Sequence, residues 1–209
     1  MLANWITLAR FPLLAPCLAV LYVGSPAIRV AGAAVLFLGF MLDTVDGIVA
    51  RRRGESSLAG SVLDIAADRA YELALWVAFA HLGLIPVVLP LVVLARTTLT
   101  DAFRSLGLAA GTAPFAQPGG RWARALVASP WMRTGYAAAK IGGFCGLALA
   151  RAFVDFPAES AWRAAASGLM AAASALVWLA ALLCVLRGLP VIAQGCRRLR
   201  ADTGLGDAV

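Results

Sequence analysis

Charge is scarce in this sequence. Only 14% of its 209 residues are Asp, Glu, Lys or Arg, whereas 62% are hydrophobic, and the mean hydropathy is +0.85. A single soluble core of this size cannot hide so much apolar surface. The composition therefore argues against a soluble globular protein and favours one that folds in a lipid bilayer.

Metal-binding patterns of cysteine and histidine are also missing. The cysteines, at Cys17, Cys145, Cys184 and Cys196, lack the paired spacing of a metal site, so we expect small buried apolar side chains. His81 is the only histidine, and it falls at the end of a predicted helix. We expect an interfacial position for it and assign it no role as a ligand.

Apolar stretches recur that are long enough to cross a hydrocarbon core of about 30 Å. We predict one all-α integral membrane domain over residues 1–209, and we expect the first span to be retained because it has no small-residue cleavage site. The six predicted transmembrane helices are Trp5–Val23, Ile28–Ala50, Leu58–Leu82, Ile85–Leu106, Arg133–Phe153 and Ala161–Leu186.

The basic residues predict the orientation of these spans, because Lys and Arg concentrate on the cytoplasmic side of a membrane. With the N-terminus inside, the arginine-rich segments 51–53, 121–124 and 197–200 are all cytoplasmic, and the other side receives Arg29, Arg151 and Arg163. We therefore expect both termini in the cytoplasm. The net charge of +7 then reflects topology and contact with anionic lipid, and no nucleic-acid partner is expected.

Two segments lie outside the predicted spans. Residues 107–130 are rich in Gly, Pro, Ala and Arg, which is compatible with a cytoplasmic loop, an interfacial helix or a lid. The tail, 194–209, is basic and predicted to be amphipathic as far as Asp202.

Four aspartates in the second and third predicted spans are unusual for membrane helices. Carboxylates inside spans are costly and need partners or water. Asp43 and Asp46 are three residues apart, and Asp64 and Asp68 are four apart, so each pair shares one helix face. Because a short connection joins the two helices, we expect them to be antiparallel neighbours with four carboxylates around one pocket.

Such a pocket needs positive charge between its carboxylates. Ligands that are all oxygen select hard cations, so we predict two ions of Mg²⁺ or Mn²⁺. Two bridged ions are a recurrent solution for displacement at phosphorus, since they stabilise charge on the phosphoryl oxygens and the leaving group. The pattern therefore indicates phosphate chemistry.

The full spacing is more specific than the aspartates alone. It reads Asp43, two residues, Asp46-Gly47, two residues, Ala50-Arg51, eight residues, Gly60, three residues, Asp64, three residues, Asp68. This segment, 43–68, resembles the signature of the CDP-alcohol phosphatidyltransferase family at every specified position. The resemblance implies a membrane enzyme that transfers a phosphatidyl group from CDP-diacylglycerol to a small alcohol.

The resemblance also implies roles for the signature residues. Asp43, Asp46 and Asp64 would hold the metal ions that bind the donor diphosphate. Asp68 would contribute to the metal site and take the proton of the acceptor hydroxyl as the general base. The CDP-binding residues would be Gly47, Ala50 and Gly60, which let the nucleotide approach the backbone, together with Arg51 and Thr7.

A second resemblance concerns the acceptor. Asn4, Thr7 and Arg10 are similar to the Asn-x-x-Thr-x-x-Arg opening of bacterial phosphatidylglycerophosphate synthases. Departures occur at Thr97, where those enzymes usually carry an acidic residue, and around Lys140, where Gly-Lys-x-Lys-Thr is reduced to Ala-Ala-Lys-Ile. Glycerol 3-phosphate is the expected acceptor, with inositol phosphate, serine or another alcohol left open.

A phosphorylated acceptor needs cations of its own. Arg96, Arg104 and Lys140 are the candidates: the two arginines of the fourth predicted span are similar to two at the same separation in those synthases, and Lys140 lies inside the fifth predicted span. The alternative for each is an ion pair inside the bundle, for which Asp101 and Glu72 are the available acids.

Two other classes of membrane protein use carboxylates in their helices. An ion-coupled transporter normally has more spans or an internal repeat, and neither is evident. A membrane prenyltransferase needs more helices than 209 residues provide. The family resemblance also implies a homodimer, which we expect in a bacterial cell membrane with the site facing the cytoplasm.

Overall fold

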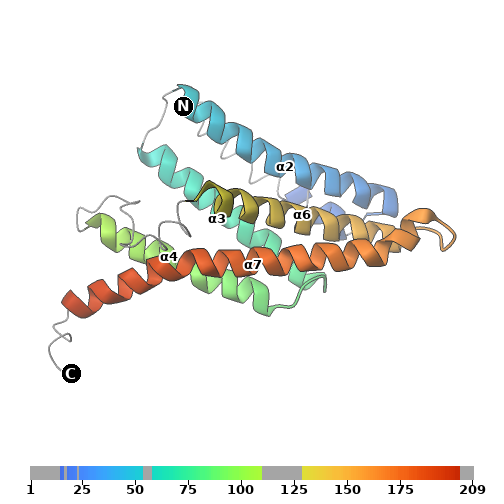
Figure 1. Ribbon diagram of the computed structural model, residues 1–209. Coiled ribbons are helices and arrows are strands. Elements are labelled where there is room, and N and C mark those ends of the chain that lie inside the picture. Colours follow the sequence, from blue (N-terminus) through green and yellow to red (C-terminus); the bar gives the residue numbers. More distant parts are fainter. Residues whose placement is uncertain (1–14, 17, 23, 54–57, 110–128, 203–209) are drawn as a thin grey trace. The chain divides into compact units, whose positions relative to one another are not determined.

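The computed structural model describes residues 15–16, 18–22, 24–53, 58–109 and 129–202, with the backbone alone for 42–53, 58–65, 106–109 and 200–202. Within these ranges every regular element is an α-helix, which confirms the all-α prediction (Figure 1). Of the first predicted span, residues 15–16 and 18–22 are described and helical, and its other residues lie outside the described part of the chain. The longer helices are α2 (Pro26–Arg53), α3 (Leu58–His81), α4 (Val88–Ala109), α6 (Pro130–Val154) and α7 (Ala161–Asp202).

Local sequence explains where these helices begin and end. Beyond the end of α3, Gly83 has a φ of +69° and donates to the Ala80 carbonyl, while Leu84 donates to the Phe79 carbonyl. This pair of hydrogen bonds is the Schellman arrangement, which favours glycine at that position. The turn continues as far as Val87, so α4 begins three residues later than the predicted Ile85. At the start of α7, the Ser160 hydroxyl caps the helix by accepting the Arg163 amide.

The last helix is longer than the predicted span. It was expected to end at Leu186, but α7 has 42 residues and runs through Pro190 to Asp202. Most of the residues expected to form a separate tail from 194 therefore belong to this helix. At 1.5 Å per residue α7 is about 63 Å long, roughly twice the thickness of a hydrocarbon core.

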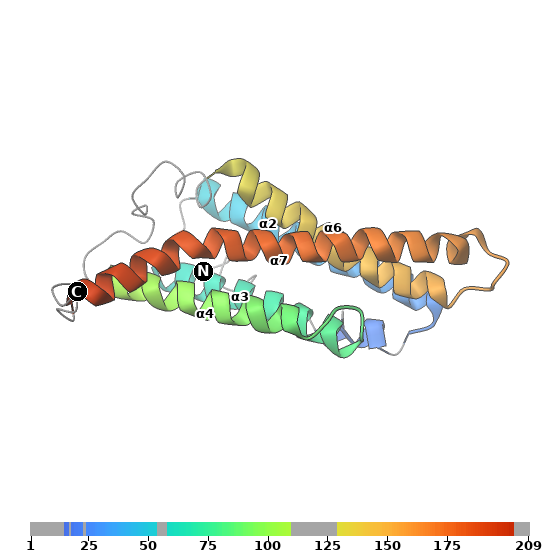
Figure 2. The same ribbon diagram turned by 60° about the horizontal axis from the view of Figure 1, so that its bottom comes forward.

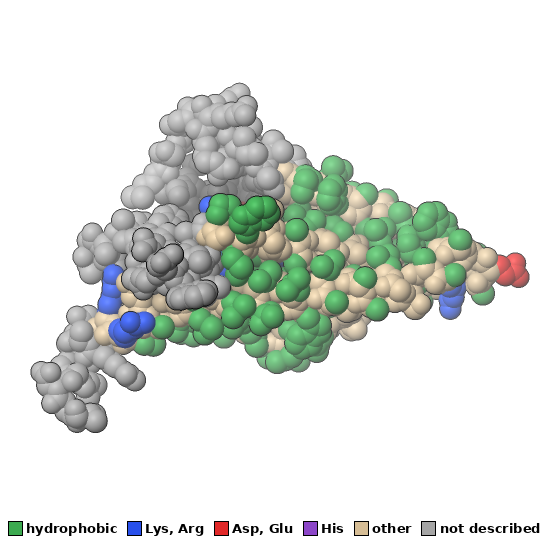
Figure 3. All heavy atoms as spheres, in the orientation of Figure 1, with side chains coloured by type: hydrophobic (Ala, Val, Ile, Leu, Met, Phe, Trp, Pro, Cys, Tyr) green, Lys and Arg blue, Asp and Glu red, His purple; other side chains and the backbone are tan. Residues whose placement is uncertain are grey.

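Two helices have the length and hydropathy to cross a membrane in the part of the chain that the structure describes. They are Pro130–Val154 and Ala161–Leu199, with mean hydropathies of 1.4 and 2.5, and Pro26–Met41 is a shorter apolar helix. Many large hydrophobic side chains are exposed, and Figure 3 shows them spread over the visible face with few charged groups among them. Trp131, at the start of α6, is 86% exposed. Exposed apolar surface of this extent suits contact with lipid.

The chain divides into two compact units. The first unit comprises Met1–Val87 and Lys140–Val177, and the second comprises Val88–Ala139 and Trp178–Val209. Helices α2 and α3 therefore belong to the first unit and α4 to the second, while α6 and α7 each contribute to both.

In the first unit, aromatic side chains pack α3 against α6. The Phe144 ring lies edge-on to Trp76 at 5.0 Å and to Phe79 at 4.8 Å, and all three side chains are fully buried. Helix α6 also approaches α7 closely, because a Cβ on Gly143 would lie 2.7 Å from a methyl of Val177. One turn later, Gly146 faces Ala173, so α6 and α7 run in opposite directions here. Small residues at such crossings allow close packing of membrane helices.

In the second unit, α4 and the later part of α7 run side by side (Figures 1 and 2). Gly188 faces Arg96, and Gly195 faces the ring of Phe103. Both members of the second contact lie seven residues after those of the first, so the two helices are parallel and share a heptad register.

The cysteines match the expectation of burial only in part. Cys184 is buried and Cys145 is partly buried, but Cys196 is exposed, which corrects the prediction for that residue. Because Gly195 faces α4, the next residue along α7 is turned away by about 100°. Cys17 lies outside the described residues.

Candidate functional site

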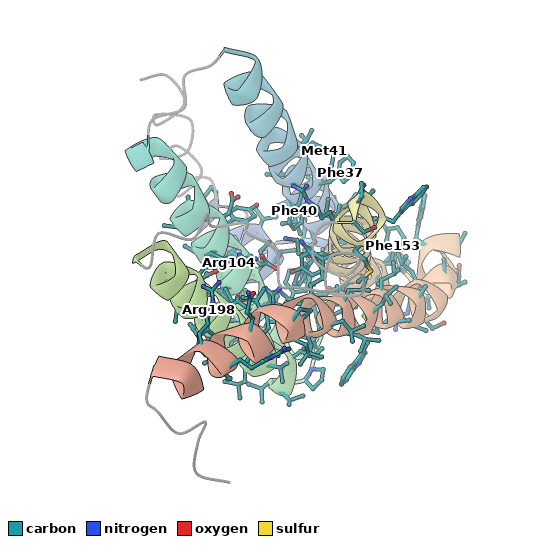
Figure 4. The ribbon with its side chains drawn as sticks, turned by 60° about the vertical axis from the view of Figure 1, so that its left-hand side comes forward. Phe37, Phe40, Met41, Arg104, Phe153 and Arg198 are labelled. Carbon is teal, nitrogen blue, oxygen red and sulfur yellow. The ribbon has the colours of Figure 1, made fainter. Side chains whose placement is uncertain are left out.

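The signature aspartates lie on two helices of the first unit. Asp43 and Asp46 are in the second half of α2, and Asp64 and Asp68 are near the start of α3. These two helices contact each other where the Phe40 ring lies edge-on to Tyr71, at a centroid distance of 6.1 Å. Phe40, which is labelled on α2 in Figure 4, comes three residues before Asp43. The structure thus places both halves of the signature on neighbouring helices, as the sequence predicts.

Among these four aspartates, only Asp68 has a described side chain, and it is exposed. The side chains of the other three lie outside the described part of the chain. The same holds for the predicted CDP-binding residues, which are Thr7, Gly47, Ala50, Arg51 and Gly60. Their roles stay predictions.

The residues that the structure describes include no group of three or more His, Cys, Asp or Glu side chains able to hold a metal ion. Asp68, however, lies one helical turn from Asp64 and is accessible from outside the helix bundle. Carboxylate oxygens at this spacing suit a hard cation such as Mg²⁺. The donor chemistry of the signature therefore fits the predicted metal.

Lys140 forms an ion pair that the sequence offered as the alternative to phosphate binding. Its Nζ lies 3.5 Å from Oε2 of Glu72 and 5.9 Å from the centre of the Phe40 ring. Glu72 is one helical turn after Asp68 on α3 and is buried. Lys140 thus belongs to the first unit, close to both helices that carry the signature.

The other two candidate cations belong to α4 in the second unit. Arg104 pairs with Asp101 at 3.7 Å, which is again the alternative that the sequence offered. Arg104 and Arg198, from α4 and α7, lie at the same end of these helices (Figure 4). Arg96 differs, because its Nε is buried and has no hydrogen-bond partner in the described part of the chain. A buried donor that lacks a partner is costly, so this position suits a ligand that accepts hydrogen bonds.

Two further arginines gather with Arg96 in the second unit. The charges of Arg96 and Arg133 both act on Arg187, whose guanidinium carbon lies 5.7 Å from the centre of the Tyr136 ring. The Nε of Arg187 is also buried without a hydrogen-bond partner among the described residues. We call Arg96, Arg133 and Arg187 the arginine cluster.

The positive charges of Arg96 and Arg133 both repel that of Arg187, and an anion beside these groups would relieve the repulsion. Guanidinium binds phosphate through paired hydrogen bonds, so the arginine cluster can hold a phosphate group. Sequence reasoning missed Arg187 because it falls just beyond the predicted end of the last span at Leu186. It did not single out Arg133 because that residue begins the predicted span Arg133–Phe153, where an arginine at the membrane surface is ordinary. The available signal was a set of arginines inside or beside apolar helices with few acids near them in sequence.

Comparison with known proteins agrees with the signature. The profile of the CDP-alcohol phosphatidyltransferase family matches residues 1–194 of this chain. Proteins of Mycobacterium tuberculosis and Mycobacterium bovis, each named "Putative cardiolipin synthase", are 34% identical to it over 107 residues. These residues cover 51% of the chain and 44% of each relative, so the match spans less than half the length of the curated relatives. On the extent of the profile match, the chain belongs to the CDP-alcohol phosphatidyltransferase family.

Proposed function

We propose that this protein transfers a phosphatidyl group from CDP-diacylglycerol to the hydroxyl group of an acceptor, with release of CMP, in phospholipid synthesis. The family match over residues 1–194 is the observation that carries the proposal. Support comes from α2 and α3, which carry the two halves of the signature on contacting helices. Neither an ion-coupled transporter nor a prenyltransferase accounts for the family match.

The signature residues would hold the metal. Asp43, Asp46, Asp64 and Asp68 would bind two ions of Mg²⁺ or Mn²⁺. When bound, these ions neutralise charge on the donor diphosphate and on the departing CMP. The proposed CDP site adds Gly47, Ala50, Gly60, Arg51 and Thr7, whose small side chains or polar groups suit a nucleotide.

The proposed reaction is a displacement at phosphorus. The acceptor oxygen forms a bond to the phosphorus that carries diacylglycerol, and the bond from that phosphorus to the oxygen of CMP breaks. The acceptor proton passes to Asp68. A carboxylate can serve as this base when it lies within hydrogen-bond reach of the hydroxyl as attack proceeds. The exposure of the Asp68 side chain supports the proposal, since a substrate can reach it.

For the acceptor we propose glycerol 3-phosphate, whose phosphate suits the guanidinium groups of the arginine cluster. The buried Nε atoms of Arg96 and Arg187 support this choice, because they are donors for which the described residues supply no acceptor. Arg104 pairs with Asp101, so it contributes less net positive charge than the sequence suggested. Inositol phosphate would use the same cluster, whereas serine would not need it.

The name of the mycobacterial relatives suggests a second acceptor. A cardiolipin synthase makes a lipid that contains more than one phosphatidyl group, so its acceptor is itself a phospholipid. A phosphodiester in such an acceptor also carries negative charge that the arginine cluster can bind. The relatives and this chain share 34% identity over 107 residues, which makes the lipid acceptor a necessary arm of any assay.

We propose a six-span arrangement in a bacterial cell membrane, with both termini and the aspartates at the cytoplasmic face. Helix directions within each unit support this topology. In the first unit the contacts Glu72 to Lys140 and Trp76 to Phe144 show that α3 and α6 are parallel, and α7 opposes α6. In the second unit α4 and α7 are parallel. In a chain whose consecutive spans cross the membrane in alternating directions, every second span is parallel, as α3 is to α6 and α4 is to α7. We further propose that the enzyme is a homodimer.

The test is release of CMP from CDP-diacylglycerol by the purified chain, with Mg²⁺ or Mn²⁺. The acceptors to compare are glycerol 3-phosphate, inositol phosphate, serine, phosphatidylglycerol and none. We expect stimulation by glycerol 3-phosphate, and we expect Asp64→Asn to abolish it. If only another compound stimulates CMP release, that compound replaces glycerol 3-phosphate as the proposed acceptor. Absence of CMP release and of metal-dependent CDP-lipid binding would overturn the proposed reaction.

A further inference from the structure

Glu72 is a buried carboxylate close to the signature that the proposed reaction does not use. It lies four residues after Asp68 on α3, and its side chain is only 11% exposed. Burying a carboxylate in an apolar environment is unfavourable unless cations compensate it. The cations around Glu72 therefore indicate its role.

Two cations from different helices meet this carboxylate. Lys140 Nζ of α6 lies 3.5 Å from Glu72 Oε2, and Arg69 Nη1 of α3 lies 3.8 Å from the same oxygen. Arg69 directly follows Asp68, so Glu72 joins the base-bearing turn of α3 to α6.

The Lys140 ammonium is also held from a third helix. It lies 5.9 Å from the centre of the Phe40 ring of α2, at a distance where an aromatic face attracts a cation. Phe40 is itself held in place, because Tyr71 packs edge-on against it and the Tyr71 hydroxyl fills the space beside Gly39. Lysine has a flexible stem of four carbons, so these contacts decide where its charge lies.

We propose that Glu72 is a positioning residue: it holds the Lys140 ammonium between α2 and α3, beside the turns that carry Asp43 and Asp68, so that Lys140 can bind an anionic group of the acceptor. Glu72 acts through Lys140 and does not itself touch the substrate. The Lys140 side chain keeps 17% of its surface exposed, which leaves a ligand access to it. This inference rests on the proposed function.

A purely structural salt bridge explains these observations less well. Buried ion pairs add little net stability compared with apolar residues of similar size, because both charges lose their hydration. Here the pair uses the only lysine in the sequence and lies one turn from the proposed base. A charged pair at this position is explained if Lys140 binds the acceptor.

The experiment uses the full-length chain in phospholipid vesicles and measures CMP release. The acceptor is the one that stimulates the wild-type chain, varied at saturating CDP-diacylglycerol. For Glu72→Gln we expect the acceptor KM to rise on the order of tenfold, by analogy with the loss that follows when the partner of a metal-binding side chain is removed. The KM for CDP-diacylglycerol should stay within about twofold, because the inferred effect is confined to the acceptor. Glu72→Asp keeps the charge and should lie closer to wild type. Glu159→Gln makes the same change at an exposed residue and should match wild type.

A double-mutant comparison tests whether Glu72 acts through Lys140. Lys140→Met should raise the acceptor KM, and adding Glu72→Gln to it should raise that KM no further. The double variant leaves no unpaired charge from this pair, so it also serves if Glu72→Gln alone does not accumulate. An unchanged acceptor KM in Glu72→Gln or Lys140→Met would overturn the inference, as would a further rise in the double variant. A wild-type chain without acceptor-dependent CMP release would instead sink the proposed function.

Discussion

Gly188 of α7 lies directly against the side chain of Arg96 of α4. A Cβ at Gly188 would lie 2.6 Å from Arg96 Nε and 2.8 Å from Arg96 Cγ, both too close for ordinary contact. The absence of a side chain at 188 thus makes room for an arginine of the proposed phosphate site.

Gly188→Ala should therefore displace Arg96 without unfolding the protein. We expect the KM for the acceptor to rise about five- to tenfold, because a small misplacement of a positioning group is enough to weaken substrate binding. The measurement is CMP release against acceptor concentration. Gly168→Ala is the matched control on the same helix, since a Cβ there meets no atom within 4 Å. Equal kinetics for the two variants would contradict the placement of Arg96 in the site.

Arg187 should contribute to binding through its planar guanidinium. Arg187→Lys keeps the charge but loses the capacity for paired hydrogen bonds and the guanidinium contact with the Tyr136 ring, so we expect at least a tenfold rise in acceptor KM. Arg197→Lys, at an exposed position of the same helix, is the control and should leave the KM unchanged. If both variants behave like wild type with a phosphorylated acceptor, the arginine cluster does not bind its phosphate.

The proposed base and the proposed metal ligands should be separable. Asp68→Asn should retain metal-dependent binding of CDP-diacylglycerol and lose at least about a hundredfold in turnover, the scale of general base catalysis. Asp64→Asn should lose donor binding as well. Equilibrium binding of a labelled donor, measured beside CMP release, distinguishes the two. Equal loss of binding in both variants would make Asp68 mainly a metal ligand.

Removal of the metal should stop the reaction reversibly. A chelator should abolish CMP release, and added Mg²⁺ or Mn²⁺ should restore it, because the four carboxylates of the proposed metal site would need cations to remain ionised. Ca²⁺ also prefers oxygen ligands but requires a larger coordination shell, so restoration by Ca²⁺ should be weaker. Full activity in the chelator would rule out the metal-dependent reaction.

The close crossing of α6 and α7 should contribute to the stability of the first unit. Gly143→Ala places a Cβ 2.7 Å from a methyl of Val177 and 3.1 Å from its backbone nitrogen, so we expect a loss of about 1–3 kcal/mol. Gly135→Ala lies on the same helix with no atom within 4 Å, and it should be neutral or slightly stabilising. Thermal unfolding midpoints in detergent compare the two. A Gly143→Ala midpoint at or above that of Gly135→Ala would contradict this packing.

The sequence predicted the helices that surround the signature well. The end of α3 was placed within one residue, because Gly83 stops the helix there. Ion pairs of the candidate cations with Glu72 or Asp101 were anticipated as the alternative to phosphate binding, and the structure shows which cation takes which acid for Lys140 and Arg104. Because the chain has few acidic residues, the sequence left few possible ion-pair partners for these cations.

The arginine cluster could not be predicted in the same way. Arg96, Arg133 and Arg187 come from three helices, and their proximity depends on how those helices pack. The end of α7 was also missed, because Pro190 and the nearby arginines resemble the edge of a membrane span. A helix continues through these residues where packing against α4 supports it, as Gly195 against Phe103 shows.

The seven-residue register between α4 and α7 restricts how the length of α7 can change. An insertion of one residue between Gly188 and Gly195 would rotate everything that follows by about 100°, carrying Gly195 away from Phe103. An insertion of seven residues would nearly restore the original face, with a drift of only about 20°. Length variation among natural homologues in this stretch should therefore occur in whole heptads, whereas the stretch beyond Gly195 is released from that rule.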